Sequence, residues 1–364
     1  MMNTTLKTGI VAALLMATFT QAQAKQWTLA DCVNYALANN ISLKKTKVQQ
    51  LSAFEDVKQS QAALLPSLSF STSQNLTYQP WPQTGRQTVT DGYVQSSVDK
   101  TYYNGSYSVS GNWTVWNGGR NTNQVKLNKL TEQMAVLDSA QTANTILEQI
   151  AQYYVQILYS TEAIKVNKAS LETSQKNEER GKTMVGVGKM SKADLAQLTA
   201  QRAQDEYNIV EAESNLRNYK RQLKQLLQIT DDEEFDVAIP ATTDAMALEE
   251  VPALNAVYTA TIEHRPEIKA AQLGVESSDL SVKIAKAQRM PTIGLNAGVS
   301  TSTNSMSTDA WGSQMKTNFN VGGGLTVSIP LFDNRSSKTA VNKAMLQRET
   351  YLLDLKDKQT TLYS

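Results

Sequence analysis

The sequence is poor in the residues from which most catalytic and metal sites are built. Its 364 residues include one cysteine, Cys32, and one histidine, His264. A disulfide within one chain is therefore excluded, and zinc sites or nucleophiles that need cysteine and histidine together lack their residues. Carboxylate chemistry is not excluded by this count. The formal net charge of +1 also lacks the basic surplus that is typical of general nucleic-acid-binding proteins.

The first residues have the three parts of a secretory signal peptide, which we expect to span residues 1–24. Lys7 supplies the positive charge, residues 10–19 are apolar, and an A-x-A cleavage site ends at Ala24. The apolar run is too short to cross a bilayer as a helix, and no later stretch reaches the roughly 18 apolar residues that such a helix needs. We therefore expect an exported chain that begins near Lys25 and crosses a membrane, if at all, with strands.

One pattern occurs twice in the sequence, at an offset of about 225 residues. A helical pattern starts at Asn39 (NNISLKK) and ends before Pro66. A second helical pattern starts at His264 (HRPEIKA) and ends before Pro291, after the same number of residues. Two copies in one register predict two similar structural units in one chain.

After each proline the hydrophobic period changes from helical to two. Apolar side chains alternate with serine, threonine and asparagine over residues 68–78, and the same alternation covers residues 292–299. A second alternating run follows in each copy, at residues 106–115 and 318–329. None of these runs carries a charge, and a length of about 10 to 12 residues suits a tilted transmembrane strand. The pattern predicts two membrane β-hairpins.

Four strands are too few to close a membrane barrel. Strands that cross a bilayer must form a closed barrel, because open edges would leave backbone groups unpaired in lipid. The smallest membrane barrels use about eight strands. Two, three or four chains must therefore pool their strands, and this argument does not choose among those numbers.

A long helical pattern follows the first hairpin. It runs from about Asn121 to about Met184, roughly 95 Å at 1.5 Å per residue. Its apolar residues recur in steps of three and four, and after a glycine-containing turn the pattern returns as far as Ile229. This predicts an antiparallel coiled-coil hairpin. Arg202 and Asp205 interrupt the apolar stripe of the returning helix.

Together these features resemble the TolC family of outer-membrane efflux proteins. The resemblance is carried by the opening WTLADCVNYALANN, the segment HRPEIKAA, the prolines Pro66 and Pro291, the turn SIPLFDNR, and the hairpin segment MVGVGKMSKADLAQLTAQ. It covers essentially the whole mature chain. Each motif alone is weak, but their order, doubled at a fixed offset, makes the resemblance specific.

The resemblance implies a mainly α fold with membrane β structure. It implies a homotrimeric duct of long antiparallel coiled-coil helices, with a 12-stranded barrel to which each chain gives four strands. It implies the outer membrane of a Gram-negative cell, with the helical part in the periplasm. The implied function is export or efflux of small molecules or secreted proteins, together with an inner-membrane transporter and a periplasmic adaptor (membrane fusion) protein. We expect no enzyme activity, no catalytic, cofactor or metal site, and no nucleic-acid partner.

The family docks its adaptor at the tip of the helical hairpin. The matching residues here are Val187, Gly188, Met190, Ser191 and Asp194. Gly188 suits a tip because it has no Cβ to restrict its backbone. We expect Ser191 to cap the next helix, with Asp194 in the capping-box place. Turn and cap roles would also explain all five residues, so adaptor contact and a local role are both open at this point.

The expected organisation is a signal peptide, a first repeat, a connector and an incomplete second repeat. Arg120 corresponds to Arg335, so Ser364 matches position 149, and roughly 80 residues of the second copy are missing relative to the family. The periplasmic gate residues of the family cannot be assigned. The expected ranges are 1–24, 25–229 (with hairpins at 67–116 and 120–229), 230–252, and 253–364 (with a hairpin at 292–330).

Three other protein classes share some of these features. A nutrient porin carries many strands and little helix, which the long helical runs disfavour. A periplasmic coiled-coil adaptor, or a structural stalk without transport activity, fits the helical hairpin but not the uncharged, doubled strands. A periplasmic enzyme would need a site such as the acidic run 231–234, which is better explained as a solvated connector. We expect His264, near the start of a helix, to be a surface or packing residue.

Overall fold

The computed structural model divides the chain into two compact units. Unit 1 comprises Met1–Lys47 and Ser139–Ala253, and unit 2 comprises Val48–Asp138 and Leu254–Ser364. Among the described helices, none combines the length and the apolar character needed to cross a membrane. The expected signal peptide and most of the expected connector lie outside the described residues. Those residues are 26–81, 87–90, 93–96, 100–230, 235–240 and 253–363.

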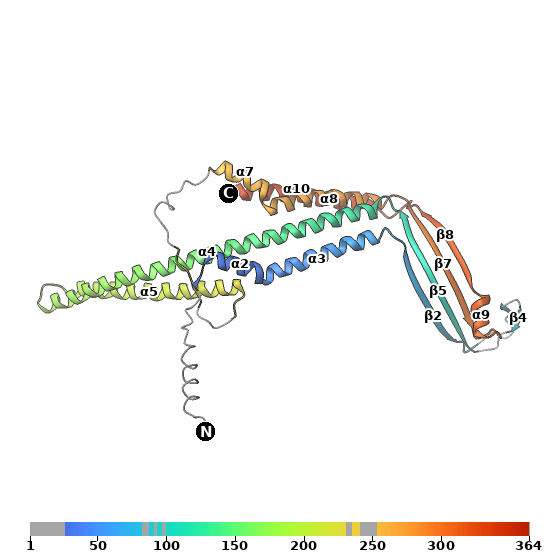
Figure 1. Ribbon diagram of the computed structural model, residues 1–364, viewed down its shortest axis with the longest axis horizontal. Coiled ribbons are helices and arrows are strands. Elements are labelled where there is room, and N and C mark those ends of the chain that lie inside the picture. The colour runs from blue at the N-terminus through green and yellow to red at the C-terminus, as the bar shows by residue number, and fades with distance from the viewer. Residues whose placement is uncertain are drawn as a thin grey trace, which may run out of the picture. The chain divides into compact units, whose positions relative to one another are not determined.

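Unit 1 is built on a long helical hairpin (Figure 1). Helix α4 (Arg120–Gly186) has 67 residues and continues into unit 1 from unit 2, and α5 (Lys192–Leu227) returns from its end. The long antiparallel hairpin expected from the helical pattern is therefore present. Near its base the core includes α2 (Leu29–Asn39), whose Cys32 is fully buried.

A short parallel ribbon closes the base of unit 1. Strand β1 (Gln26–Trp27) pairs with β6 (Asp236–Val237), and Phe235 and Val237 join the hydrophobic core. The hydroxyl of Tyr154 on α4 donates to the carbonyl of Ala238, 2.5 Å away. Burial raises the pKa of this tyrosine. The ribbon and this hydrogen bond fasten the segment that follows α5 to the long helix.

Asn40 separates α2 from α3 (Ile41–Ala62). Its backbone is extended, with ψ of 127°. Its side chain accepts a hydrogen bond from the N–H of Ser42 (2.8 Å) and donates to the carbonyl of Leu226 on α5 (2.9 Å). The Asn40 side chain thus caps the start of α3 and fixes it to the hairpin. These two hydrogen bonds also provide partners for a polar side chain that is buried.

Unit 2 contains one four-stranded antiparallel sheet (Figure 1). The spatial order is β2-β5-β7-β8, so the two hairpins of the repeat are joined through β5 and β7. The uncharged alternating runs predicted as strands form this sheet. The strands are β2 (Ser67–Tyr78), β5 (Thr101–Trp116), β7 (Thr292–Asn304) and β8 (Asn320–Ser328).

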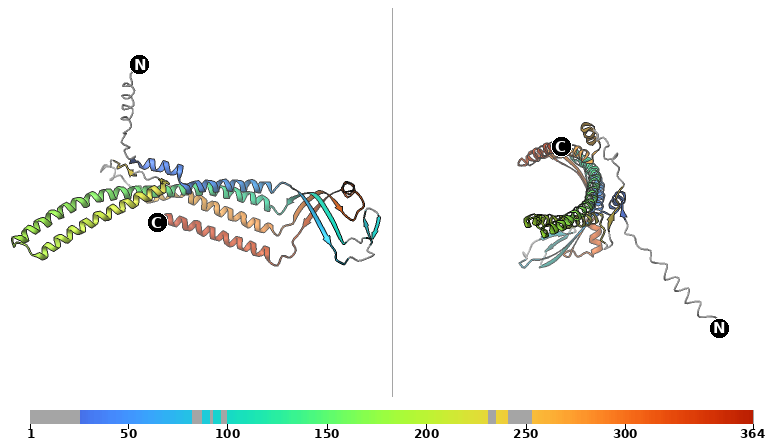
Figure 2. Two further views of the ribbon diagram at one scale, coloured as in Figure 1. Left: turned by 90° about the horizontal axis from the view of Figure 1, so that it is seen from below. Right: turned by 90° about the vertical axis from the view of Figure 1, so that its left-hand side faces the viewer.

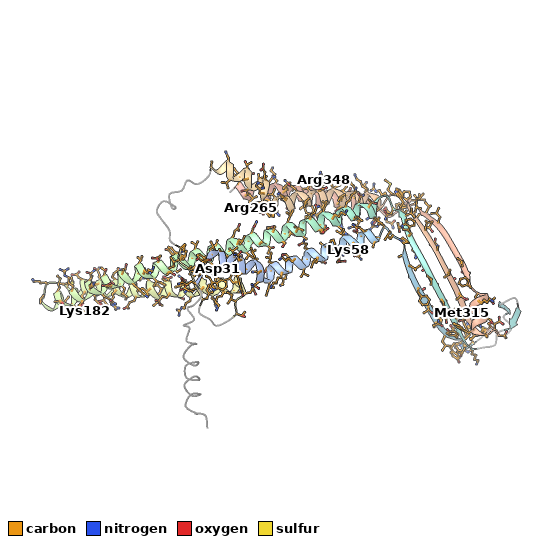
Figure 3. The ribbon with its side chains drawn as sticks, in the orientation of Figure 1. Asp31, Lys58, Lys182, Arg265, Met315 and Arg348 are labelled. Atoms are coloured by element: carbon orange, nitrogen blue, oxygen red, sulfur yellow. The ribbon has the colours of Figure 1, made fainter. Side chains whose placement is uncertain are left out.

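The helices of unit 2 lead into and out of this sheet. Helix α8 (Pro266–Ala287) precedes β7 and α10 (Ser336–Tyr363) follows β8, and the two lie side by side (Figure 2). Arg348 of α10, labelled in Figure 3, donates to the carboxylate of Asp279 on α8. Helix α7 (Leu254–His264) directly precedes α8 along the chain.

Three elements appear in the loops that the sequence pattern left unassigned. Strands β3 (Gln87–Thr90) and β4 (Tyr93–Ser96) form a small ribbon between β2 and β5. Helix α9 (Trp311–Thr317) lies between β7 and β8 and packs against β7. The Trp311 ring meets the Tyr107 ring edge-on, with centroids 6.2 Å apart.

Candidate functional site

The register of the sheet separates its two faces by polarity. Phe70, Val109, Val299 and Val321 lie opposite one another across the four strands, which places them on one face. The residues between them are mostly serine, threonine, asparagine and glycine, so the other face is polar. The predicted alternation is thus expressed as one apolar and one polar surface.

Small hydroxyl and amide groups pair across the polar face. Ser71 and Ser108 lie 2.7 Å apart between their hydroxyl oxygens, and Ser69 and Ser110 lie 3.1 Å apart. The Ser300 hydroxyl donates to the Asn320 side chain at 2.8 Å. In these cross-strand pairs the polar side chains hydrogen-bond to one another, and none of them is charged. The face therefore presents a neutral, hydrophilic surface of small side chains.

Strands β2 and β8 form the two outer edges of the sheet. Within the described residues, neither strand has a partner on its outer side. The apolar side chains of these two strands are also exposed to solvent, Leu68 by 78% and Val321 by 72%. Unpaired strand edges and a large exposed apolar face are unfavourable in water. Because β2 and β8 run in opposite directions, an edge of one copy can pair with the other edge of a second copy in the same antiparallel sense.

The ends of the helices are tied to the ends of the strands at one side of the sheet. The Trp113 indole N–H donates to the carbonyl of Leu64 (2.8 Å), and the Asn121 side chain donates to the carbonyl of Ala63 (3.2 Å). These bonds join the end of α3 to β5 and α4. We call this region, where α3, α4, α8 and α10 meet the strands, the helix–strand junction.

The predicted adaptor-docking residues lie together at the tip of the helical hairpin. Val187 is 65% exposed, and Gly188 has the positive φ of 73° that favours glycine. Ser191 caps α5 as expected: its hydroxyl oxygen accepts the N–H of Asp194 at 3.1 Å. The Asp194 carboxylate in turn accepts from the Ser191 hydroxyl (2.8 Å). Met190 is half-buried, while Ser191 and Asp194 are exposed.

Close packing behind the tip depends on a glycine. A Cβ on Gly181 would lie 2.7 Å from Leu198 Cδ1, 3.3 Å from Leu195 Cδ1 and 3.5 Å from Met190 Sδ. The absence of a side chain at this position lets α5 approach α4 closely. Gly186, five residues nearer the tip, has no neighbouring atom within 4 Å of its Cβ position. Gly181 therefore has a packing role that Gly186 does not share.

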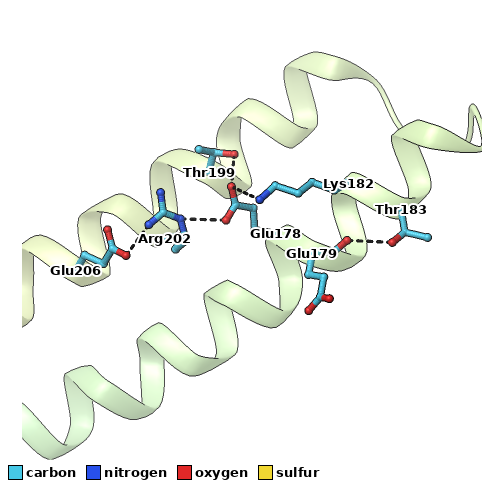
Figure 4. Close-up of polar contacts among 7 residues, drawn as sticks. All are labelled: Glu178, Glu179, Lys182, Thr183, Thr199, Arg202 and Glu206. Atoms are coloured by element: carbon cyan, nitrogen blue, oxygen red, sulfur yellow. Dashed lines mark hydrogen bonds and ion pairs between the residues drawn. The ribbon is translucent and has the colours of Figure 1, made fainter.

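A polar network interrupts the apolar seam of the hairpin near its tip (Figure 4). Glu178 of α4 is buried, with its side chain 9% exposed. One carboxylate oxygen accepts from the Thr199 hydroxyl (2.9 Å) and lies 3.2 Å from Lys182 Nζ. The other lies 2.9 Å from Arg202 Nε, and Arg202 reaches Glu206 at 2.6 Å. Both carboxylate oxygens of Glu178 therefore have partners, as a buried charge requires.

These contacts set the charge state of Glu178. The Thr199 hydroxyl, followed by the charges of Lys182 and Arg202, lowers the pKa of the Glu178 carboxyl against the opposing effect of burial. Glu206, and then Glu178, raise the pKa of the Arg202 guanidinium. The sequence marked Arg202 as an interruption of the apolar stripe but gave no partner for it. The network around Glu178 therefore holds α4 and α5 in one fixed alignment, close to the tip.

A groove of about 610 Å³ lies among the helices of unit 2. Asp56, Asp354 and Asp357 line it, together with the ring of Tyr351 and the Lys358 side chain. No cluster of three histidine, cysteine or acidic residues suited to hold a metal ion occurs within the residues that the structure describes.

Comparison with known proteins identifies relatives of both the sequence and the fold. The family described as outer membrane efflux protein matches residues 32–227 and 257–364. The toxin and drug export protein A of Aggregatibacter actinomycetemcomitans is 25% identical over 333 residues, which cover 91% of this chain and 67% of that protein.

Solved channel structures share the fold at low sequence identity. The chain resembles CusC, a transmembrane channel, with a TM-score of 0.74 and 15% identity, over 92% of this chain and 73% of that one. It resembles the CmeC outer membrane channel of Campylobacter jejuni with a TM-score of 0.73 and 17% identity, over 92% of this chain and 68% of that one. The expected TolC-like architecture of long helices and four strands is therefore confirmed.

Proposed function

Because the chain belongs to the outer membrane efflux protein family, we propose that it is one subunit of a homotrimeric export duct. The observation that carries this proposal is the four-stranded sheet with two unpaired edges and an exposed apolar face. In a bilayer every backbone hydrogen-bonding group needs a partner, so such a sheet must close with other copies. Three copies of four strands give a 12-stranded barrel.

In the proposed trimer the β8 edge of one copy pairs with the β2 edge of the next. The apolar face, which carries Phe70 and Val321, then faces lipid, and the polar face lines the lumen. Pairs such as Ser71 with Ser108 give that lumen a neutral surface. A lumen of this kind has hydrogen-bonding capacity but no shaped pocket. It suits passage of varied solutes, either small molecules or unfolded secreted chains.

We further propose that the hairpin tip docks a periplasmic adaptor protein, which connects the duct to an inner-membrane transporter. The exposed Val187 and the glycine turn at Gly188 offer an apolar, compact contact at the end of a rigid helix pair. The Glu178–Arg202 network fixes the register of the two helices close behind that contact. The transporter supplies the energy, and the duct is passive.

A matched pair of substitutions tests the proposed docking. Val187→Asp places a charge at the tip, and Val210→Asp places one on a valine of α5 with similar exposure, 61% against 65%. Each variant is expressed in a Gram-negative strain that lacks its own outer-membrane channel, and resistance to a panel of toxic small molecules is measured. We expect Val187→Asp to abolish the resistance that the wild type and Val210→Asp both restore, at equal levels in the outer membrane. Equal resistance for both variants would rule out docking at the tip.

A further inference from the structure

Basic residues gather in the segments of α4, α8 and α10 that adjoin the sheet. Residues 120–131, 280–290 and 331–347 together contain nine basic residues and a single acidic one, Asp333. The sheet strands carry no charge at all, so positive charge begins in these three segments where the strands end. The end of α3, which also reaches the junction, does not share the surplus, because it carries Glu55 and Asp56 beside Lys58. The basic residues are Arg120, Lys126, Lys129, Lys283, Lys286, Arg289, Arg335, Lys338 and Lys343.

Contacts at the junction bring the three basic segments together. A Cβ at Gly118, just before α4, would lie 2.5 Å from the Cβ of Met290, just after α8. Arg289 Nε donates to the Ser337 hydroxyl at the start of α10 (3.2 Å). These two contacts place the start of α4, the end of α8 and the start of α10 next to one another at the same side of the sheet. We call the three adjoining basic segments the basic band.

A small hollow at this band combines positive charge with apolar surface. It has a volume of about 280 Å³. Leu331 and Phe332 on its wall are 93% and 86% exposed, which is unusual for side chains of their size. Asp333 is committed to its own partners: its carboxylate accepts the Ser337 N–H at 2.8 Å. The lining residues are Arg289, Pro330, Leu331, Phe332, Asp333, Ser337 and Lys338.

We propose that the helix–strand junction binds anionic phospholipid of the membrane leaflet that faces the helices. The lipid phosphate would lie between Arg289 and Lys338, and its acyl chains would pack against Leu331 and Phe332. A free anion would use the cations but would leave this exposed apolar wall in water. Interfacial basic residues next to an anionic leaflet each strengthen its binding about fivefold. The inference rests on the proposed function, because that function places the strands in the membrane.

Native mass spectrometry of the purified full chain tests the proposal with defined lipids. The wild type is prepared in detergent with equal amounts of phosphatidylglycerol and phosphatidylcholine, and the retained lipids are counted. The test variant is Lys338→Gln/Lys343→Gln, which keeps the Arg289–Ser337 hydrogen bond. The control, Lys189→Gln/Lys192→Gln, removes the same charge from exposed residues near the hairpin tip.

We expect the wild type and the control to retain phosphatidylglycerol over phosphatidylcholine, and the junction variant to lose at least fivefold of that preference. Lys338→Arg should keep it, because the charge is preserved. Equal retention of the two lipids by the wild type would overturn the proposal, and so would an equal loss in the control. Displacement of phosphatidylglycerol by inorganic phosphate at equal concentration would also overturn it, since the surface would then bind a free anion.

Insertion into vesicles separates a failure of this inference from a failure of the proposed function. Wild-type chain that inserts into vesicles of either lipid without preference leaves the proposed function intact and removes the lipid site. A chain that inserts neither into phosphatidylglycerol vesicles nor into phosphatidylcholine vesicles contradicts both the lipid site and the proposed function.

Discussion

Asp333 has the same structural role in the second copy of the repeat that Asn117 has in the first. The N–H of Asn121 donates to the Asn117 side chain at 3.2 Å, and the N–H of Ser337 donates to the Asp333 carboxylate at 2.8 Å. Each capping residue is followed by two residues with positive φ, which are glycines only in the first copy. These are Gly118 (67°) and Gly119 (77°), and Asn334 (50°) and Arg335 (68°). Both strand-to-helix turns therefore share one backbone conformation. In this alignment Arg335 corresponds to Gly119, and Ser336 at the start of α10 corresponds to Arg120 at the start of α4. The correspondence of Arg120 with Arg335 that the sequence suggested is therefore wrong by one residue.

The first prediction separates backbone strain from packing at this turn. Gly119→Ala should lower stability by about 1–2 kcal/mol, the cost of a left-handed backbone for a residue with a Cβ. Gly118→Ala should cost about 1–3 kcal/mol more, because its Cβ would overlap Met290 and approach the carbonyl of Ala287. Thermal unfolding of both variants in detergent, followed by circular dichroism, measures the difference. Equal melting temperatures for the two would contradict the contact with Met290.

The second prediction concerns the acid stability of the helical hairpin. The pKa of Glu178 is lowered in the folded chain from its ordinary value of 4.5. A lowered folded pKa contributes stability that is complete above the unfolded pKa and is lost as pH falls through the folded one. We therefore expect the wild type to be more stable than Glu178→Gln at neutral pH, with an advantage that shrinks below about pH 4.5.

The difference in melting temperature between the wild type and Glu178→Gln, followed from about pH 3 to about pH 7, measures this gain in stability. Glu179→Gln changes an exposed carboxylate on the next residue and serves as the control. It should show no such pH-dependent difference from the wild type. A Glu178→Gln variant that is as stable as the wild type at neutral pH would show that the network adds nothing to the hairpin.

The third prediction uses the two glycines behind the tip. Gly186→Ala should be neutral or should stabilise the end of α4 by up to about 1 kcal/mol, because it meets no neighbour and favours the helix. Gly181→Leu should separate α4 from α5, because Leu198 and Leu195 already fill the space beside it. Hydrogen exchange of the hairpin tip should then rise only in Gly181→Leu. Unchanged exchange in that variant would contradict close packing at Gly181.

Much of this fold follows from the sequence because its main signals are periodic. The alternation that begins after Pro66 and Pro291 predicts strands, and β2 and β7 begin at Ser67 and Thr292. Their absence of charge and their duplication predict two membrane β-hairpins, which the structure joins into one sheet through β5 and β7. Ser191 was recognisable as a helix cap from its place between a glycine turn and a helical pattern, and the structure bears this out.

Other features lack a periodic signal. Helix α9 has 7 residues, and β1 and β6 have two each, which is too short for a hydrophobic period to show. The burial of Glu178 depends on the register of α4 against α5, which brings Thr199 and Arg202 to it. A single helical pattern cannot give that register. The junction hollow similarly arises from segments that are distant in sequence.

The number of copies in the protein extracted from the outer membrane tests the central claim most directly. Outer membranes of cells that express the full chain are isolated, and the detergent-solubilised protein is weighed by native mass spectrometry. We predict a trimer that requires detergent, because three copies join the free edges of β2 and β8 into one closed sheet. A monomer that remains in solution without detergent would contradict the account.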